Sequence, residues 1–97
     1  MTVSRKPTHP GAVLREDVLP ATGLTVAEMA RRLRVSRQSL HRILAEEQPI
    51  TAATALKLAR LLGTSPDSWL NMQRAVDLWQ ESHRLADELA KIEQVAA

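Results

Sequence analysis

Apolar residues along the chain recur every three or four positions, which is the spacing of amphipathic helices. The first segment of this kind is expected to form a helix from about Pro10 to Val18. Proline suits a first helical turn, and the Leu19-Pro20 step together with Gly23 is expected to end the helix.

Two short helices on either side of a tight turn are expected next. Thr25 and Glu28 form a capping box at the start of the first, and Ser36 is suited to cap the second, which is expected to run from Arg37 to about Ala45. The apolar positions that face inward are Met29, Ala30 and Leu33 in the first helix and Leu40, Ile43 and Leu44 in the second. Two short helices separated by about three residues have the spacing of a helix-turn-helix.

Two further helix starts follow in the second half of the chain. Thr51 is an N-cap residue for a fourth helix, and Gly63 follows the expected end of that helix, where a left-handed residue is favoured. Ser65 caps a fifth helix, and Pro66 takes its first position.

The fifth helix is expected to be long. Apolar side chains recur from Trp69 to Ala96, and no glycine or proline interrupts them. A helix of more than about twenty residues in so small a chain has more apolar surface than one core can cover. Its distal part is therefore expected to pack against another chain, with Trp79, Leu89 and Ile92 at a dimer or partner interface.

Length and composition narrow the fold class. The chain has 97 residues, the size of one domain, and its core must be built without Phe or Tyr from residues such as Leu, Ala and Met, which favour helices. We expect an all-α, five-helix fold with an extended C-terminal helix. Its parts are a flexible basic arm over residues 1–9, a helix-turn-helix domain over residues 10–80 and a helical extension over residues 81–97.

Residue types that are missing exclude several classes of protein. The chain has no cysteine, and therefore no disulfide framework, thiolate zinc site or cysteine nucleophile. No apolar run reaches the roughly 20 residues of a membrane span, and the first residues lack a signal peptide, so we expect a cytoplasmic protein with no membrane partner. The spacing of His9, His41 and Glu16 fits no metal site, and no cofactor is expected.

The net charge of +2 conceals two halves of opposite sign. Residues 1–45 carry eight basic and three acidic side chains, whereas residues 46–97 carry five basic and eight acidic ones. Five of the eight basic residues of the first half lie between Arg31 and Arg42, with no acid among them. A solvated surface normally mixes the two signs, so this cluster points to a polyanionic partner.

Side chains on the exposed face of the second short helix are suited to read DNA. If this helix enters a major groove, its first turns reach the base edges. Arg37 and Arg42 can each pair with guanine and Gln38 with adenine, whereas Ser39 and His41 are weaker candidates. Phosphate contacts are expected from Ser36, Thr25 and Arg31, and from Arg5 and Lys6 on the arm.

Several segments together resemble the HigA (VapI-like) antitoxins of the lambda-repressor-like (XRE) helix-turn-helix class. The segments that carry the resemblance are His9-Pro10-Gly11, Val35-Ser36-Arg37-Gln38-Ser39-Leu40, Pro49-Ile50-Thr51 and Ser65-Pro66-x-x-Trp69-Leu70-Asn71-Met72-Gln73. The resemblance implies five helices and a homodimer on a palindromic operator of double-stranded DNA. It also implies repression of the chain's own operon and neutralisation of a HigB (RelE-like) ribonuclease toxin.

Two positions depart from that family. Arg34 stands where the family usually has a small residue or glycine before the recognition helix, so a left-handed backbone there would cost more than with glycine. After the recognition helix the family commonly has a basic loop, whereas this chain has Ala45-Glu46-Glu47-Gln48. Either this loop lies away from the DNA, or non-specific affinity is weaker than in similar proteins.

Two other functions remain open from the sequence. One is a stand-alone helix-turn-helix regulator without a toxin, and the other is a protein-binding module in which the acidic second half binds a basic partner. An enzyme is the least favoured class, because nothing resembles a nucleophile with its base, a phosphate-binding loop or a metal set.

Overall fold

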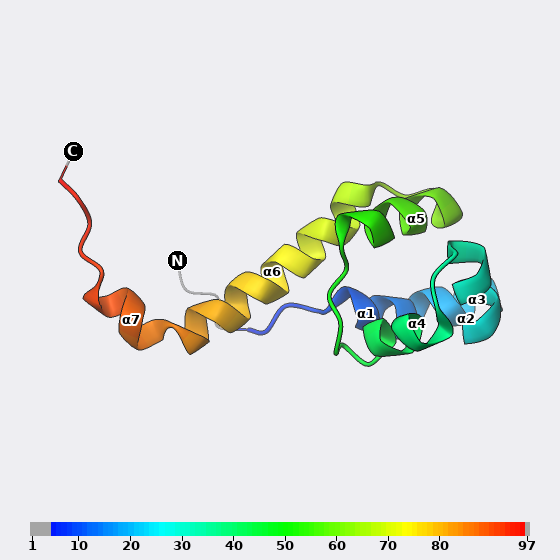
Figure 1. Ribbon diagram of the computed structural model, residues 1–97, viewed down its shortest axis with the longest axis horizontal. Helices are drawn as coiled ribbons and strands as arrows, with labels where there is room; N and C mark the ends of the chain where they lie inside the picture. The colour runs from blue at the N-terminus through cyan, green and yellow to red at the C-terminus, as the bar shows by residue number, and fades with distance from the viewer. Residues whose placement is uncertain (1–4, 97) are drawn as a thin grey trace.

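The computed structural model describes residues 5–96, and the regular structure in this range is entirely helical (Figure 1). Residues 1–4 of the expected arm and residue 97 of the expected extension lie outside the described range. The elements are α1 (Pro10–Val13), η1 (Leu14–Val18), α2 (Leu19–Thr22), α3 (Val26–Leu33), α4 (Arg37–Leu44), α5 (Ala52–Leu62), α6 (Pro66–Arg84) and α7 (Ala86–Lys91). The first three are continuous, so the described chain forms six helices where five were expected.

The first helix does not end at Leu19-Pro20, as the sequence predicted, but continues to Thr22. Its middle part, η1, is a π-helix, in which the backbone N–H of Leu19 donates to the carbonyl of Leu14. Proline has no N–H and its ring clashes with the carbonyl four residues earlier, and a π turn relieves both conflicts by adding a residue to the turn. The helix ends at Gly23, whose φ is 70°.

The helix starts predicted from the sequence are confirmed. At each of four N-caps the side-chain oxygen accepts a hydrogen bond from the backbone N–H three residues later; the caps are Thr25, Ser36, Thr51 and Ser65. The capping box of Thr25 and Glu28 is complete. These local bonds satisfy N–H groups that a helix leaves free, so they fix where α3, α4, α5 and α6 begin.

The prediction of one uninterrupted helix up to Ala96 is wrong. Helix α6 ends at Arg84, Leu85 leaves the helical conformation, and Ile92 is already extended beyond the end of the short α7. Ile92 therefore does not lie on a common helical stripe with Trp79.

Two features of the sequence explain this break. Ser82 Oγ donates to the carbonyl of Trp79 at 2.9 Å, and His83 Nδ1 lies 2.7 Å from the same oxygen. Side-chain bonds to a helix carbonyl compete with the helix's own bonds and bend the helix. No residue in the range 77–96 is buried, so tertiary packing does not hold the distal helix straight.

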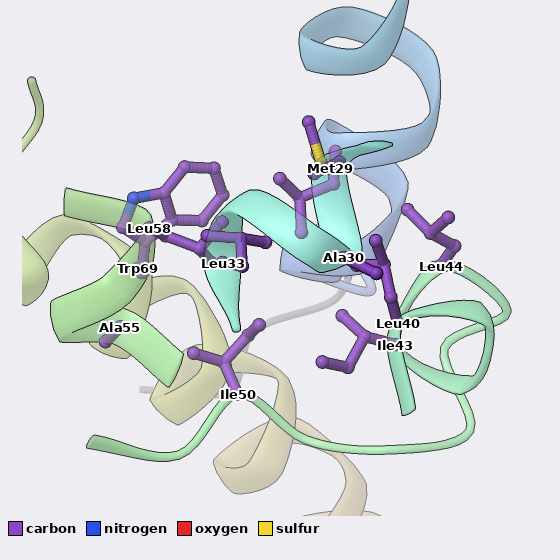
Figure 2. Packing of buried hydrophobic residues seen from close by; sticks show 11 residues of the cluster. Met29, Ala30, Leu33, Leu40, Ile43, Leu44, Ile50, Ala55, Leu58 and Trp69 are labelled. Atoms are coloured by element: carbon purple, nitrogen blue, oxygen red, sulfur yellow. The ribbon is translucent and has the colours of Figure 1, made fainter. Parts of the chain in front are cut away.

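The hydrophobic core lies where α3, α4, α5 and the start of α6 meet (Figure 2). All six inward-facing residues predicted for α3 and α4 are buried in it. Trp69 is also buried, and its Nε1 donates to Thr64 Oγ1 at 2.9 Å. The buried residues of the core are Leu14, Met29, Ala30, Leu33, Leu40, Ile43, Leu44, Ile50, Ala55, Leu58 and Trp69.

A buried glutamine joins the loop after α4 to α6. The side-chain oxygen of Gln73 accepts a hydrogen bond from the backbone N–H of Ile50 at 2.9 Å, and its Nε2 donates to Asp77 at the same distance. Because both ends of the amide are paired, their hydrogen bonds offset the cost of desolvating this buried polar group, and they fix the path of the loop.

The start of α1 lies directly against the end of α4. A Cβ added to Gly11 would overlap the carbonyl oxygen of Ile43, so only glycine lets the two backbones approach so closely. His9 caps the same turn, since its Nδ1 accepts a hydrogen bond from the N–H of Gly11 at 2.9 Å.

We expect Gly11→Ala to lower the free energy of unfolding by roughly 3 kcal/mol, because the new methyl group meets backbone rather than a movable side chain. Urea unfolding followed by circular dichroism measures the change. Gly23→Ala is the matched control: position 23 has open space around it, and its positive φ should cost only about 1 kcal/mol. Equal losses in the two variants would show that the contact with Ile43 is unimportant.

Candidate nucleic-acid interface

The exposed face of α4 carries most of the predicted base-reading residues. Arg37, Gln38, His41 and Arg42 are all exposed, and the opposite face of the helix is buried in the core. Arg37 and His41 are four residues apart, as are Gln38 and Arg42, so the four side chains form two neighbouring rows. The structure thus brings two guanidinium groups, an amide and an imidazole together on one free surface.

Ser39 differs from these four residues. Its side chain is half-buried, and its Oγ accepts a hydrogen bond from Gln48 Nε2 at 2.8 Å. In this arrangement it ties the loop after α4 back to the helix.

Two of the residues predicted to contact phosphate, Thr25 and Ser36, are the N-caps of α3 and α4, whereas Arg31 lies in the last turn of α3. Ser36 Oγ accepts the N–H of Ser39, and Thr25 Oγ1 donates to Glu28 Oε1 at 3.0 Å, while Arg31 is exposed on α3. Helix N-termini attract anions through their free N–H groups. The structure therefore places these three residues on α3 and at the start of α4.

Arg15 forms a hydrogen bond to the C-terminal end of α4. Its Nη1 donates to the carbonyl of Leu44 at 2.6 Å and lies 3.3 Å from Glu46 Oε2. A guanidinium suits this position, because the carbonyl end of a helix carries partial negative charge. Neither partner of Arg15 was predicted from the sequence; the only available signal was one basic and one acidic residue, 31 positions apart.

One of the two carboxylates in the loop after α4 is held in an ion pair. Glu46 has a left-handed backbone, with φ of 63°, and its carboxylate pairs with Arg15. Only Glu47 of the two carboxylates remains without an ion pair among the described residues.

Arg34 adopts the left-handed conformation considered from the sequence, with φ of 59°. It ends α3, and its carbonyl accepts a hydrogen bond from Lys57 Nζ at 3.1 Å. A bond from α5 thus supports the turn at which the family usually has a smaller residue.

Lys6 lies away from α4. The arm from residue 5 to residue 9 runs beside α6 (Figure 1), where Lys6 Nζ is 5.9 Å from the centre of the Trp79 ring. The ring of His83 packs on Trp79 as well, with centroids 4.3 Å apart. The structure therefore does not bring Arg5 and Lys6 together with the residues of α4, and Trp79, predicted at an interface, is half-buried within its own chain.

His9 is buried at the start of α1, and this burial affects its pKa. Burial lowers the pKa of His9 below 6.5; Lys6 and Arg15 add to this effect, and Glu46 and Asp77 oppose it. The neutral imidazole fits its role as an acceptor at the start of α1. Within residues 5–96 no cluster of side chains could hold a metal ion, and no helix there is long and apolar enough to span a membrane.

Comparison with known proteins identifies this arrangement of helices. Residues 14–69, more than half of the chain, match the model of the helix-turn-helix family. The chain belongs to the helix-turn-helix family. In the terms of that family, α3 and α4 form the motif and α4 is the recognition helix.

Family members with known names include both regulators and antitoxins. The chain is 39% identical over 95 residues to YbaQ of Escherichia coli, an uncharacterized HTH-type transcriptional regulator, covering 96% of this chain and 84% of YbaQ. It is 36% identical over 84 residues to the antitoxin HigA-1 of Vibrio cholerae, covering 87% of this chain and 79% of HigA-1.

A solved structure agrees over the whole length. The antitoxin GraA in complex with its operator superimposes with a TM-score of 0.89 at 34% identity, covering 100% of this chain and 99% of GraA. The resemblance to HigA antitoxins and the all-α, lambda-repressor-like fold expected from the sequence are confirmed.

The lowered pKa of His9 predicts acid sensitivity. The unfolded chain binds a proton near pH 6.5 and the folded chain only at lower pH, so the stabilising effect is complete above pH 6.5. It is lost as the pH falls through the folded pKa. We expect the free energy of unfolding to decrease between pH 7 and pH 5, as measured by urea titration. His9→Asn, which keeps a cap acceptor but cannot titrate, should flatten this slope, and an unchanged slope in that variant would contradict the assignment to His9.

Proposed function

We propose that this chain is a sequence-specific, operator-binding repressor and the antitoxin of a type II toxin-antitoxin module. The observation that carries the proposal is the exposed face of α4, where Arg37, Gln38, His41 and Arg42 lie free while the opposite face is fixed in the core. A rigid helix that presents donors suited to guanine and adenine is what major-groove reading requires.

The recognition helix is rigid because it is held at three places. Its start is capped by Ser36, its apolar face is buried, and its end is bonded to Arg15 and packed on Gly11. Preorganised side chains lose little entropy on binding, so contacts made by this surface can discriminate between base sequences.

The proposed binding unit is a homodimer on a palindromic site. Two recognition helices then enter successive major grooves about 34 Å apart, so each half-site is read once. GraA, with which the whole chain superimposes, is seen with its operator. Repression of the chain's own operon follows if the operator overlaps its promoter.

Neutralisation of a RelE-like ribonuclease is supported by different features. HigA-1 is named an antitoxin, and residues 46–97 of this chain carry a net charge of −3, which complements a basic partner. The similarity to YbaQ, named a transcriptional regulator, favours a second candidate, a stand-alone regulator without a toxin.

We expect Arg37→Ala and Arg42→Ala each to weaken operator binding by about 1–3 kcal/mol and to relax the preference at one base position. Fluorescence anisotropy with operator and with random duplexes, at a fixed salt concentration, measures both effects. Arg74→Ala is the control, because Arg74 is an exposed arginine on α6. If the ratio of operator to random binding stays constant in both variants, α4 does not read the bases.

A pull-down from the native host tests the antitoxin role separately. We expect a small basic ribonuclease to co-purify with the wild-type chain and with the double variant Arg37→Ala/Arg42→Ala, because binding to the toxin does not use the face of α4. Recovery of operator DNA alone, with no ribonuclease in either sample, would favour the stand-alone regulator.

A further inference from the structure

A cationic groove lies between the end of α3 and α5. It is a depression of about 670 Å³, and its lining is Arg32, Leu33, Arg34, Leu56, Lys57, Arg60 and Leu61. Four of these seven residues are cationic and none is acidic. Leu56 is 61% exposed, although it lies in the middle of α5. The groove therefore offers apolar surface surrounded by positive charge.

None of these cations is neutralised within the described chain. The ion pairs found in residues 5–96 involve only Arg15 and Arg84 as cations. Unpaired charge of one sign around exposed apolar surface is unfavourable in isolation and marks a binding surface.

The C-terminal extension, residues 85–96, has the opposite character. It carries three acids, Asp87, Glu88 and Glu93, against the single base Lys91. Its exposed apolar residues are Leu89 (48%), Ile92 (70%) and Val95 (88%). No residue of this segment is buried, so nothing in its own chain covers it.

We propose that the C-terminal extension of a second copy of this chain fills the groove, and that the exchange is reciprocal. The acids of the extension face the cations of the groove, and its apolar residues cover Leu56 and Leu61. Charge and apolar surface match in the same place, which a purely acidic or purely apolar partner would not achieve.

The extension cannot fill the groove of its own chain. The 19 residues of α6 span about 28 Å, and Figure 1 shows α7 at the opposite end of the molecule from α3 and α5. Two copies placed antiparallel bring each extension to the groove of its partner, which is the self-complementary arrangement of a two-fold dimer. The proposal rests on the homodimer of the proposed function and supplies its interface.

Charge reversal in pairs tests the exchange. One variant reverses the extension, Asp87→Lys/Glu88→Lys, and the other reverses the groove, Arg32→Glu/Arg60→Glu. Each variant alone places like charges together, and we expect its dimer dissociation constant in analytical ultracentrifugation to rise at least about tenfold. A mixture of the two should form a heterodimer, because both contacts are then matched. Asp17→Lys, a reversal on η1, should dimerise like the wild type.

Two outcomes would overturn the proposal. One is that both reversed variants keep the wild-type dimer; the other is that each becomes monomeric but the mixture forms no heterodimer. If the groove variant keeps the wild-type dimer but loses affinity for DNA, the proposal is also overturned. The cations of the groove would then be contacts to DNA phosphates. Ultracentrifugation is performed without DNA. The test of the dimer interface therefore remains valid even if the chain does not bind an operator.

A second measurement is independent of charge reversal. The chain contains no cysteine. A mixture of Leu56→Cys and Ile92→Cys chains therefore has one thiol in the groove of one copy and one in the extension of the other. We expect oxidation of the mixture to yield a disulfide-linked dimer well above the level with Ala21→Cys replacing Leu56→Cys, since a disulfide needs Cα atoms within about 7 Å. Equal yields would contradict the exchange.

Discussion

The close contact between the start of α1 and the end of α4 is the constraint on which the rest of the structure depends. Gly11 lets the two backbones meet at Ile43, His9 caps the same turn, and Arg15, one turn later, bonds to the carbonyl of Leu44. One short segment thus sets both the position and the end of the recognition helix. Because α4 has only two turns, its direction could not be defined by its own hydrogen bonds.

The division of charge along the chain has a more specific meaning in three dimensions than in sequence. Among the basic residues of the first half, two lie on the face of α4 and two line the groove beside α5. Lys6 lies beside α6, and Arg15 is used internally. Likewise Glu46 supports α4, whereas the acids after Leu85 form no ion pair within residues 5–96. The net charge of the sequence changes sign at Glu46, but this position does not mark a surface for a second partner. Glu46 pairs with Arg15, and both residues support the end of α4.

Local signals were sufficient to predict much of this structure. The caps at Thr25, Ser36 and Ser65 act within three residues, so the sequence alone locates the starts of their helices. The inward positions of α3 and α4 were predictable for a similar reason, since helical periodicity fixes which side chains share a face.

Features that depend on distant contacts or on competing local ones were not predictable. The π turn before Pro20 lets a proline remain inside a helix, against the usual rule, and the end of α6 follows from two side chains bonded to one carbonyl. In the candidate site, the face of α4 was found, but the support from Arg15 was not, because nothing in the sequence brings positions 15 and 46 together. The hydrogen bond from Gln48 to Ser39 was not predictable either, because it depends on the path of the loop after α4.

The two tryptophans occupy different parts of the molecule, and this affects how its unfolding can be observed. Trp69 is in the core with its indole N–H bonded to Thr64, whereas Trp79 lies out along α6 between His83 and Lys6. The intrinsic fluorescence of the chain is therefore the sum of two reporters, one for the core and one for the region where the arm meets the distal helix. The distal region contains no buried residue and can loosen before the core does. A single fluorescence transition would then combine two events, and a two-state fit to it would underestimate the stability of the core.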